Sequence, residues 1–181
     1  PFEDPQVGAA GGFIRDHTGV GFQVRVVTCD RTGRLETFMS EQSANLDQRP
    51  GADRVLSATG ANVAFRRDLV VELGGFDENY RYLLEETDLN FRIMDAGYRN
   101  VAVPQAEVHH KYAPSHIRNA ARIPQSLYAI SRSTHYFALR HGRDHVDAAT
   151  VEKRLLRFRR DRNRDIALLA REGHIDLARK A

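Results

Sequence analysis

The sequence of 181 residues is poor in cysteine and contains no long apolar run. Its one cysteine, Cys29, excludes an internal disulfide, a bond that belongs to oxidising compartments. No apolar run approaches the roughly 18 residues that span a bilayer, and no signal peptide is visible. We therefore expect a cytoplasmic protein. Cys29 lies in an alternating apolar run without a catalytic motif, which favours a structural role over a nucleophile.

Neither positive nor negative side chains are in large excess. The chain has 27 Lys and Arg against 24 Asp and Glu, a formal net charge of +3. This mild basicity does not by itself indicate a nucleic-acid binder. Hydrophobic residues make up 41% and charged residues 28%, an ordinary globular composition that excludes wholesale disorder. The length suffices for one domain with a real core.

Apolar patterning predicts a mixture of strands and helices. The strands expected from apolar runs or alternation lie at 7–14, 22–28, 34–38, 63–65 and 99–103, with a turn at 30–33 and a loop over 40–54. The helices expected from a period near 3.6 lie at 66–73, from about 87 to 97, from about 117 to 142, and from about 149 onward. This order predicts the α/β to α+β class.

Three carboxylates at the expected start of one helix offer a site for acid–base chemistry. Glu85 and Asp88 share a helix face, while Glu86 points elsewhere. A simple explanation is an acidic first turn favoured by the helix dipole, with Asp88 and Arg92 as a surface ion pair. The apolar run 80–84 before them favours partial burial, which raises a carboxylate's proton affinity. A general base for a hydroxyl needs that property.

Two adjacent histidines, His109 and His110, follow the last expected strand. Neighbours on a strand point to opposite faces, so at most one of them is expected to face a site. A lone histidine is more often structural. With carboxylates, an imidazole is compatible with a Mn²⁺ or Mg²⁺ site, but two ligands are too few, so oxygen donors from elsewhere would be needed.

Several motifs in one order resemble the second half of a family 2 glycosyltransferase, with the rhamnosyltransferase-like group as the nearest match. The motifs are Gly-Ala-Asn-Val-Ala-Phe-Arg-Arg at 60–67, Leu-Gly-Gly-Phe-Asp-Glu at 73–78, Glu-Glu-Thr-Asp-Leu-Asn-Phe-Arg at 85–92, Ala-Gly-Tyr at 96–98, and Val-Pro-Gln-Ala-Glu-Val-His-His at 103–110. The opening 4–12 is similar to the segment after that family's metal-binding Asp-x-Asp motif. The resemblance covers roughly residues 4–116.

The resemblance implies a partial GT-A fold, Rossmann-like with a mixed sheet, that lacks the N-terminal nucleotide-binding half. Residues 1–116 would form the acceptor-side half and 117–181 a C-terminal helical extension. The family implies a nucleotide-diphosphate sugar donor, a glycan or lipid-linked acceptor, a divalent cation (Mg or Mn) and inversion at the anomeric carbon. Since no Asp-x-Asp is found in the expected place, the chain is expected to be an inactive fragment in isolation.

The family's site residues are carried over by motif. Glu86 stands where the family has the aspartate that acts as general base, and Glu85 remains a rival. His110 matches a histidine near the metal and the diphosphate, with His109 as the alternate. The residues expected to bind donor or acceptor are Thr59, Gly60, Asn62, Asp77, Glu78 and Asp88.

The arginine-rich segment 151–181 is open to two interpretations. It is either a solvated helix packed through an apolar stripe, or a surface that rests on anionic lipid, making the protein peripheral at the inner membrane.

Three alternatives to an active transferase of bacterial surface glycans stay open. A non-catalytic remnant that binds a glycan or a partner is favoured by the missing Asp-x-Asp. A nucleic-acid binder would bind in a salt-sensitive way, but no aromatic platform or groove-reading motif supports it. A metal-dependent hydrolase built on Glu86 and His110 is the third.

Overall fold

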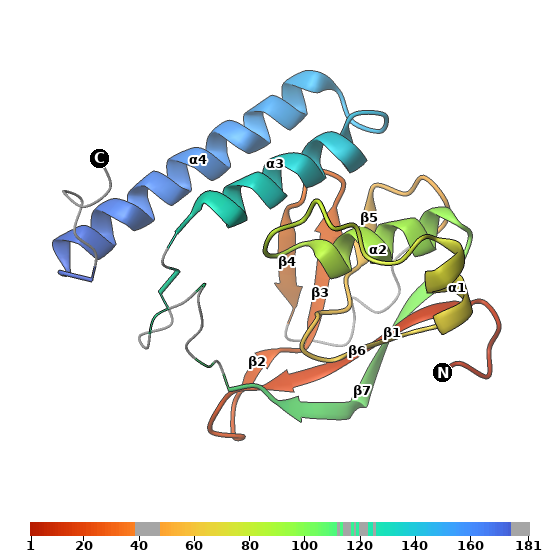
Figure 1. Ribbon diagram of the computed structural model, residues 1–181. Coiled ribbons are helices and arrows are strands. Elements are labelled where there is room, and N and C mark those ends of the chain that lie inside the picture. The colour runs from red at the N-terminus through yellow and green to blue at the C-terminus, as the bar shows by residue number, and fades with distance from the viewer. Residues whose placement is uncertain are drawn as a thin grey trace.

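A computed structural model describes residues 1–38, 48–111, 113, 117, 119, 123, 124 and 126–174. Within these residues the chain forms a mixed α/β fold of seven strands and four helices, which confirms the predicted class. Helix α2 (Glu85–Asp95) lies between the strands and the pair α3 (Tyr128–Gly142) and α4 (Ala148–Arg171), as Figure 1 shows. None of the described helices combines the length and the apolarity that crossing a bilayer requires.

The larger sheet is built around β1 (Val7–Arg15). Along one side β1 pairs in parallel with β7 (Arg99–His109). Along the other side it pairs antiparallel with β6 (Val63–Phe65) and then with β2 (Phe22–Val24). The sheet is therefore mixed, as expected.

Strand β7 continues past Pro104, where the sequence predicted its end, and this prediction was wrong. The register with β1 jumps from Gly12↔Val103 to Phe13↔Glu107, so residues 104–106 form a bulge that accommodates the proline. A side chain on Gly12 would come within 1.9 Å of the carbonyl oxygen of Ala106. The glycine thus allows the two backbones to approach closely at this point.

The smaller sheet has β3 (Val26–Asp30) between β4 (Leu35–Phe38) and β5 (Arg54–Leu56), all antiparallel. The hairpin turn predicted at 30–33 is confirmed. The single strand predicted over 22–28 is wrong, because the chain leaves the larger sheet after β2 and enters the smaller one at β3. Arg25, between the two strands, stacks on the Phe22 ring at 4.2 Å. Of the loop predicted over 40–54, residues 40–47 lie outside the described residues.

Glycines end the helices where the sequence placed them. Helix α1 (Arg67–Glu72) is followed by Gly74 and Gly75, and α2 by Gly97, all with φ between 77° and 91°. Helix α3 begins at Tyr128, later than predicted, since the described residues before it are not helical.

Helix α2 contributes side chains to two parts of the core. Leu89 and Ile93 pack with Ala9 of β1. Phe91 packs with Phe137 of α3 in a second cluster that also contains Cys29. Burial raises the pKa of the Cys29 thiol well above its ordinary value, as a structural role requires.

A buried carboxylate, Asp88, joins α2 to α3. It has no exposed surface. It accepts hydrogen bonds from Arg92 Nε and His141 Nε2, both at 2.8 Å, and forms an ion pair with Arg140 Nε at 2.9 Å. Tyr80 Oη donates to it at 3.3 Å. We call these five residues the Asp88 cluster. The pair of Asp88 and Arg92 exists as the sequence allowed, but in the interior and not on the surface.

Arg92 extends the Asp88 cluster to the paired glycines. Its two terminal nitrogens donate to the carbonyls of Leu73 at 2.8 Å and Gly75 at 2.7 Å. Burial raises the pKa of the Asp88 carboxyl, but the hydrogen bond from His141 and the nearby arginine charges outweigh it, so its pKa lies below the ordinary value.

We expect Asp88→Asn to lower the free energy of unfolding by about 3–5 kcal/mol, because buried cations lose their counter-charge. A depressed carboxyl pKa stabilises the fold above the unfolded-state pKa of about 3.9, and that contribution is lost as pH falls through the folded-state pKa. Stability should therefore fall less steeply below pH about 4 in the variant than in the native protein. Urea unfolding over a pH series measures both effects.

Asp68→Asn on α1 is the matched control. The Asp68 side chain is 95% exposed, and its pair with Arg67 is long, at 3.7 Å. Its replacement should change stability by less than about 0.5 kcal/mol. Equal losses in both variants would contradict the role given to the Asp88 cluster.

Candidate active site

The backbone that leads into α2 is strained. Leu83 and Leu84 both have left-handed conformations, with φ of 68° and 72°. Side chains rarely adopt this region, at a cost of roughly 1–3 kcal/mol each. Leu84 is anchored in the core, and the two residues turn the chain so that Glu85 and Glu86 enter the first turn of α2.

Glu86 is the carboxylate best placed for chemistry. Its side chain is half-buried, and Oε1 accepts from the backbone N–H of Gly60 at 3.2 Å. Burial and the neighbouring charge of Glu85 raise the pKa of Glu86 above its ordinary value, against the weaker effect of backbone donors that include Gly60. Among the described residues Glu86 has no ion-pair partner, so its carboxylate is not neutralised.

Glu85 is placed differently. One of its carboxylate oxygens, Oε2, is buried without a hydrogen-bond partner in the described part of the chain. Glu85 is not among the residues that line the groove next to Glu86. The charge of Glu85 therefore acts mainly by raising the pKa of Glu86.

Glu86 lines a groove of about 540 Å³ between α2, the β3–β4 turn and helices α3 and α4. The turn contributes Asp30, Thr32, Gly33, Arg34 and Leu35. The segment 83–87 and α3 contribute Leu83, Leu84, Thr87, Ile130 and Thr134. Helix α4 contributes Thr150, Lys153, Arg154, Arg157, Phe158, Asp161 and Arg162. The groove is thus acidic on the α2 side and mostly basic on the α4 side.

The β3–β4 wall of this groove is joined to helix α2 by the buried side chain of Arg31. Arg31, only 1% exposed, donates to both carboxylate oxygens of Asp95 at 2.6 and 2.8 Å and to the carbonyl of Ala52 at 2.9 Å. Its guanidinium also lies over the Phe91 ring at 4.9 Å. This bidentate pair ties the turn to the C-terminal end of α2.

The predicted residues 59–62 lie in the loop between β5 and β6. Only Gly60 contacts the carboxylate of Glu86. The Asn62 amide donates to the carbonyls of Phe13 at 3.0 Å and Ala106 at 2.8 Å, so it joins β1 to the bulge of β7. Thr59 accepts from the backbone N–H of Asn62 at 2.8 Å through its carbonyl. The loop therefore brings Gly60 to Glu86, while the Asn62 side chain holds the sheet together.

The other predicted acidic residues lie elsewhere. Asp77 accepts from the Tyr136 hydroxyl and from Arg140, both at 2.7 Å, so it borders the Asp88 cluster. Glu78 is exposed. Because Asp88 has no exposed surface, its carboxylate serves the interior and contacts no ligand in this arrangement.

The histidines do not join Glu86. His109 is exposed and lies beside Gly19 of the β1–β2 turn. His110 is half-buried, and its backbone N–H donates to the Arg15 carbonyl at 3.0 Å. Neither imidazole is among the residues that line the groove of Glu86. Glu86 and the two imidazoles therefore do not share this groove.

The basic wall from α4 was not expected from the sequence, which predicts that these arginines form a solvated or lipid-facing surface. Lys153, Arg154 and Arg157 are spaced so that they share one helix face, yet only the packing of α4 shows that this face borders Glu86.

Comparison with known proteins places this geometry in a family. Residues 17–146 match the family described as Glycosyl transferase family group 2. The chain belongs to this family. That assignment confirms the resemblance seen in the sequence and agrees with the mixed sheet and C-terminal helices.

Two kinds of relative are similar to parts of the chain. The N-acetylglucosaminyl-diphospho-decaprenol L-rhamnosyltransferase of two Mycobacterium tuberculosis strains is 40% identical over 143 residues, which is 74% of this chain and 46% of the relative. The O-antigen biosynthesis protein RfbC of Myxococcus xanthus is 36% identical over 77 residues, 42% of this chain and 6% of that protein. The chain thus spans about half the length of the rhamnosyltransferases. No solved structure matches it significantly.

Enzymes of this family generally use a divalent cation. In the part of the chain that the structure describes, no three His, Cys, Asp or Glu side chains converge to hold one. We assign no step to a metal, and the metal role of His109 or His110 stays a prediction.

Proposed function

We propose that this chain is part of an inverting glycosyltransferase in which Glu86 is the general base. The observation that carries the proposal is the position of Glu86, with its raised pKa, at the start of α2 on an open groove. The donor would be a nucleotide-diphosphate sugar. Membership of the family supports sugar transfer, and the groove supports Glu86 over Glu85.

The reaction follows from this placement. An acceptor hydroxyl oxygen attacks the anomeric carbon of the donor sugar, and its proton passes to the Glu86 carboxylate. The bond between the anomeric carbon and the diphosphate oxygen breaks, and the nucleoside diphosphate leaves with the electron pair. A raised pKa brings the proton affinity of Glu86 closer to the working pH, which improves a general base. The hydrogen bond from Gly60 fixes the direction of the carboxylate.

The names of the relatives indicate the substrates. The mycobacterial relative is named for transfer of L-rhamnose to N-acetylglucosaminyl-diphospho-decaprenol. By similarity, we propose a lipid-linked sugar diphosphate as the acceptor and bacterial surface glycan synthesis as the process. Such an acceptor places the reaction at the cytoplasmic face of the inner membrane.

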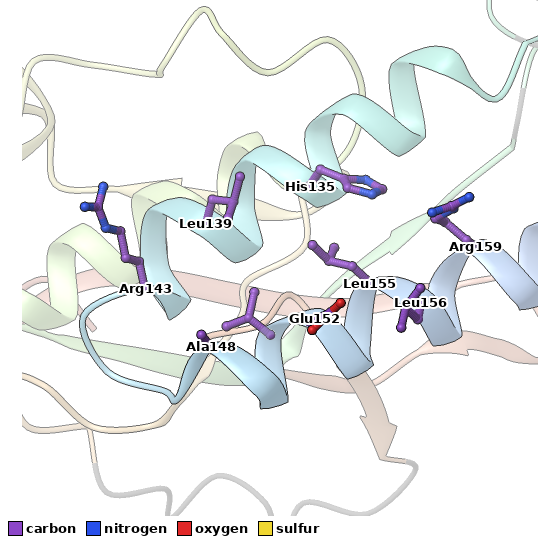
Figure 2. A pocket seen from close by; sticks show the side chains of 9 residues that line it. His135, Leu139, Arg143, Ala148, Glu152, Leu155, Leu156 and Arg159 are labelled. Carbon is purple, nitrogen blue, oxygen red and sulfur yellow. The ribbon is translucent and has the colours of Figure 1, made fainter.

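The outer groove between α3 and α4 supports a peripheral membrane contact. The groove is lined by His135 and Leu139 of α3, by Arg143 directly after α3, and by Leu155, Leu156 and Arg159 of α4 (Figure 2). Leu139 and Leu156 are 56% and 50% exposed. Helix α4 has eight basic and three acidic side chains, a formal charge of +5. Exposed apolar side chains on a basic helix are suited to an anionic lipid surface.

Glu86→Gln in the full-length protein should lower kcat for sugar transfer by about 10²–10⁴, the usual contribution of a general base. Donor binding should stay nearly unchanged, because the amide has the shape of the carboxylate. Release of nucleoside diphosphate in the presence of acceptor measures kcat, and equilibrium titration of the donor measures binding.

Glu72→Gln, at an exposed position on α1, should transfer at the native rate. Native turnover in Glu86→Gln, with a large loss in Glu85→Gln, would move the base to Glu85. If the native full-length protein transfers no sugar yet binds a glycan, the non-catalytic alternative replaces the enzyme.

A metal role for His110, with His109 as the alternate, also remains our prediction. If one imidazole is a ligand in the full-length enzyme, His110→Ala should raise the Mn²⁺ concentration needed for half-maximal transfer by about tenfold or more. His109→Ala should have the smaller effect. Unchanged Mn²⁺ titrations in both variants would remove the histidines from the metal site.

The membrane contact predicts co-sedimentation with vesicles that contain anionic phosphatidylglycerol, and much weaker binding to neutral phosphatidylcholine vesicles or at high salt. The double substitution Leu139→Gln and Leu156→Gln should reduce the bound fraction severalfold. Val71→Gln, at a position 64% exposed on α1, is the control. Equal binding by the double variant and the control would contradict the contact.

A further inference from the structure

One face of α4 presents basic side chains to the groove of Glu86. Lys153, Arg154 and Arg157 are spaced at i, i+1 and i+4, and all three line that groove. Glu86 forms no ion pair with them among the described residues, so the groove separates the carboxylate from the cations. A ligand between them would meet a base on one side and positive charge on the other.

Arg154 is held in position at this wall. Its Nη2 donates to the carbonyl of Gly33 at 3.3 Å, and its guanidinium lies 5.8 Å from the centre of the Phe158 ring. The side chain is half-buried, and burial lowers the pKa of its guanidinium. An ordered arginine loses less conformational freedom when it binds an anion.

The charge of this wall is not neutralised. In the described part of the chain neither Lys153 nor Arg154 pairs with a carboxylate, and Arg157 reaches Asp161 only at 3.9 Å, with its own side chain 71% exposed. Buried or bridging arginines elsewhere are paired closely, for example Arg31 with Asp95 at 2.6 Å. The α4 wall therefore retains positive charge available to an anionic ligand.

The wall is continuous with the apolar groove on the other side of α4. Lys153 and Arg157 also line an outer hollow of α4, together with Leu156. Leu156 in turn lines the groove between α3 and α4. The surface thus runs from a carboxylate, over cations, to apolar side chains. A sugar joined through a diphosphate to a hydrocarbon chain has the same order of groups.

We propose that Lys153, Arg154 and Arg157 form a binding site for the diphosphate of a lipid-linked acceptor, with the acceptor sugar toward Glu86 and the hydrocarbon toward the α3–α4 groove. This inference rests on the proposed function and names where its acceptor binds. Charge-assisted hydrogen bonds from arginine and lysine suit phosphate oxygens.

Direct binding tests the site without reference to catalysis. The probe is farnesyl diphosphate, a short prenyl diphosphate, titrated onto the protein in detergent and followed by calorimetry. Lys153→Gln with Arg157→Gln should weaken its binding by about tenfold or more, the loss of one or more charge-assisted hydrogen bonds. Both residues are exposed, so the melting temperature should stay native.

Arg67→Gln with Arg171→Gln removes the same charge at exposed positions that line neither the groove of Glu86, nor the outer hollow of α4, nor the α3–α4 groove. This control should bind the probe like the native protein. Equal losses in the two double variants would show non-specific attraction and overturn the site. No saturable binding of farnesyl diphosphate by the native protein would overturn it too.

A second probe distinguishes the source of the diphosphate. The donor's leaving group is a nucleoside diphosphate, so uridine, thymidine, guanosine, cytidine and adenosine diphosphate are each titrated onto the native protein. The nucleoside diphosphate that binds most tightly should bind with the same affinity to Lys153→Gln with Arg157→Gln. A loss of its binding with intact farnesyl diphosphate binding would assign the cations to the donor and overturn the proposal.

Failure of the proposed function is recognised separately. Glu86→Gln should bind farnesyl diphosphate with native affinity whether or not Glu86 is the base. If that variant still transfers sugar while Lys153→Gln with Arg157→Gln loses the probe, the base assignment fails and the diphosphate site stands. If Glu86→Gln is inactive and Lys153→Gln with Arg157→Gln binds farnesyl diphosphate normally, the base assignment stands and the diphosphate site fails.

Discussion

The buried carboxylate of Asp88 is the constraint on which the arrangement of the site depends. It fixes the first turns of α2 against the end of α3 through Arg140 and His141, and Arg92 extends the same cluster to the carbonyls of Leu73 and Gly75. A charge without exposed surface is stable only where cations and donors surround it. Removing the Asp88 carboxylate would therefore remove the group that Arg92, Arg140 and His141 share.

This cluster determines how neighbouring carboxylates differ in role. Asp88 faces inward, and the cations around it hold its pKa low. Glu86 lies two residues earlier on the other side of α2, beside Gly60 and the groove, and its pKa is raised. Of the two, Glu86 lines the groove and Asp88 does not, so the raised pKa of Glu86 bears on chemistry while the low pKa of Asp88 reflects a structural ion pair. The left-handed backbone at Leu83 and Leu84 positions both Glu86 and Asp88. The packing of the Leu84 side chain in the core helps to offset the strain of that backbone.

Much of this fold could be predicted from the sequence because its signals are local. The period of apolar residues marked α2, and the glycines after α1 and α2 gave the helix ends. The mistakes arose where tertiary contacts decide. The chain passes from the larger sheet to the smaller one at Arg25, although the apolar alternation in the sequence continues. The Asn62 amide donates a hydrogen bond to the bulge through which β7 continues past Pro104.

The site was predicted less completely, for the same reason. The resemblance to the family predicts Glu86 as the base, but the sequence could not show that Asp88 is sealed inside or that Asp77 is held by Tyr136 and Arg140. It also grouped the histidines with Glu86, whereas His109 lies beside the β1–β2 turn. The basic face of α4 borders the groove because the chain reverses direction between α3 and α4. No local sequence pattern specifies that reversal.

A crystal structure of the full-length enzyme with nucleoside diphosphate and a lipid-linked acceptor would test the central claim most directly. The account predicts the acceptor hydroxyl within about 2.6–3.2 Å of a Glu86 carboxylate oxygen, the reach of a general base. A hydroxyl bound nearest to a different carboxylate, with the groove of Glu86 occupied by neither substrate, would contradict it.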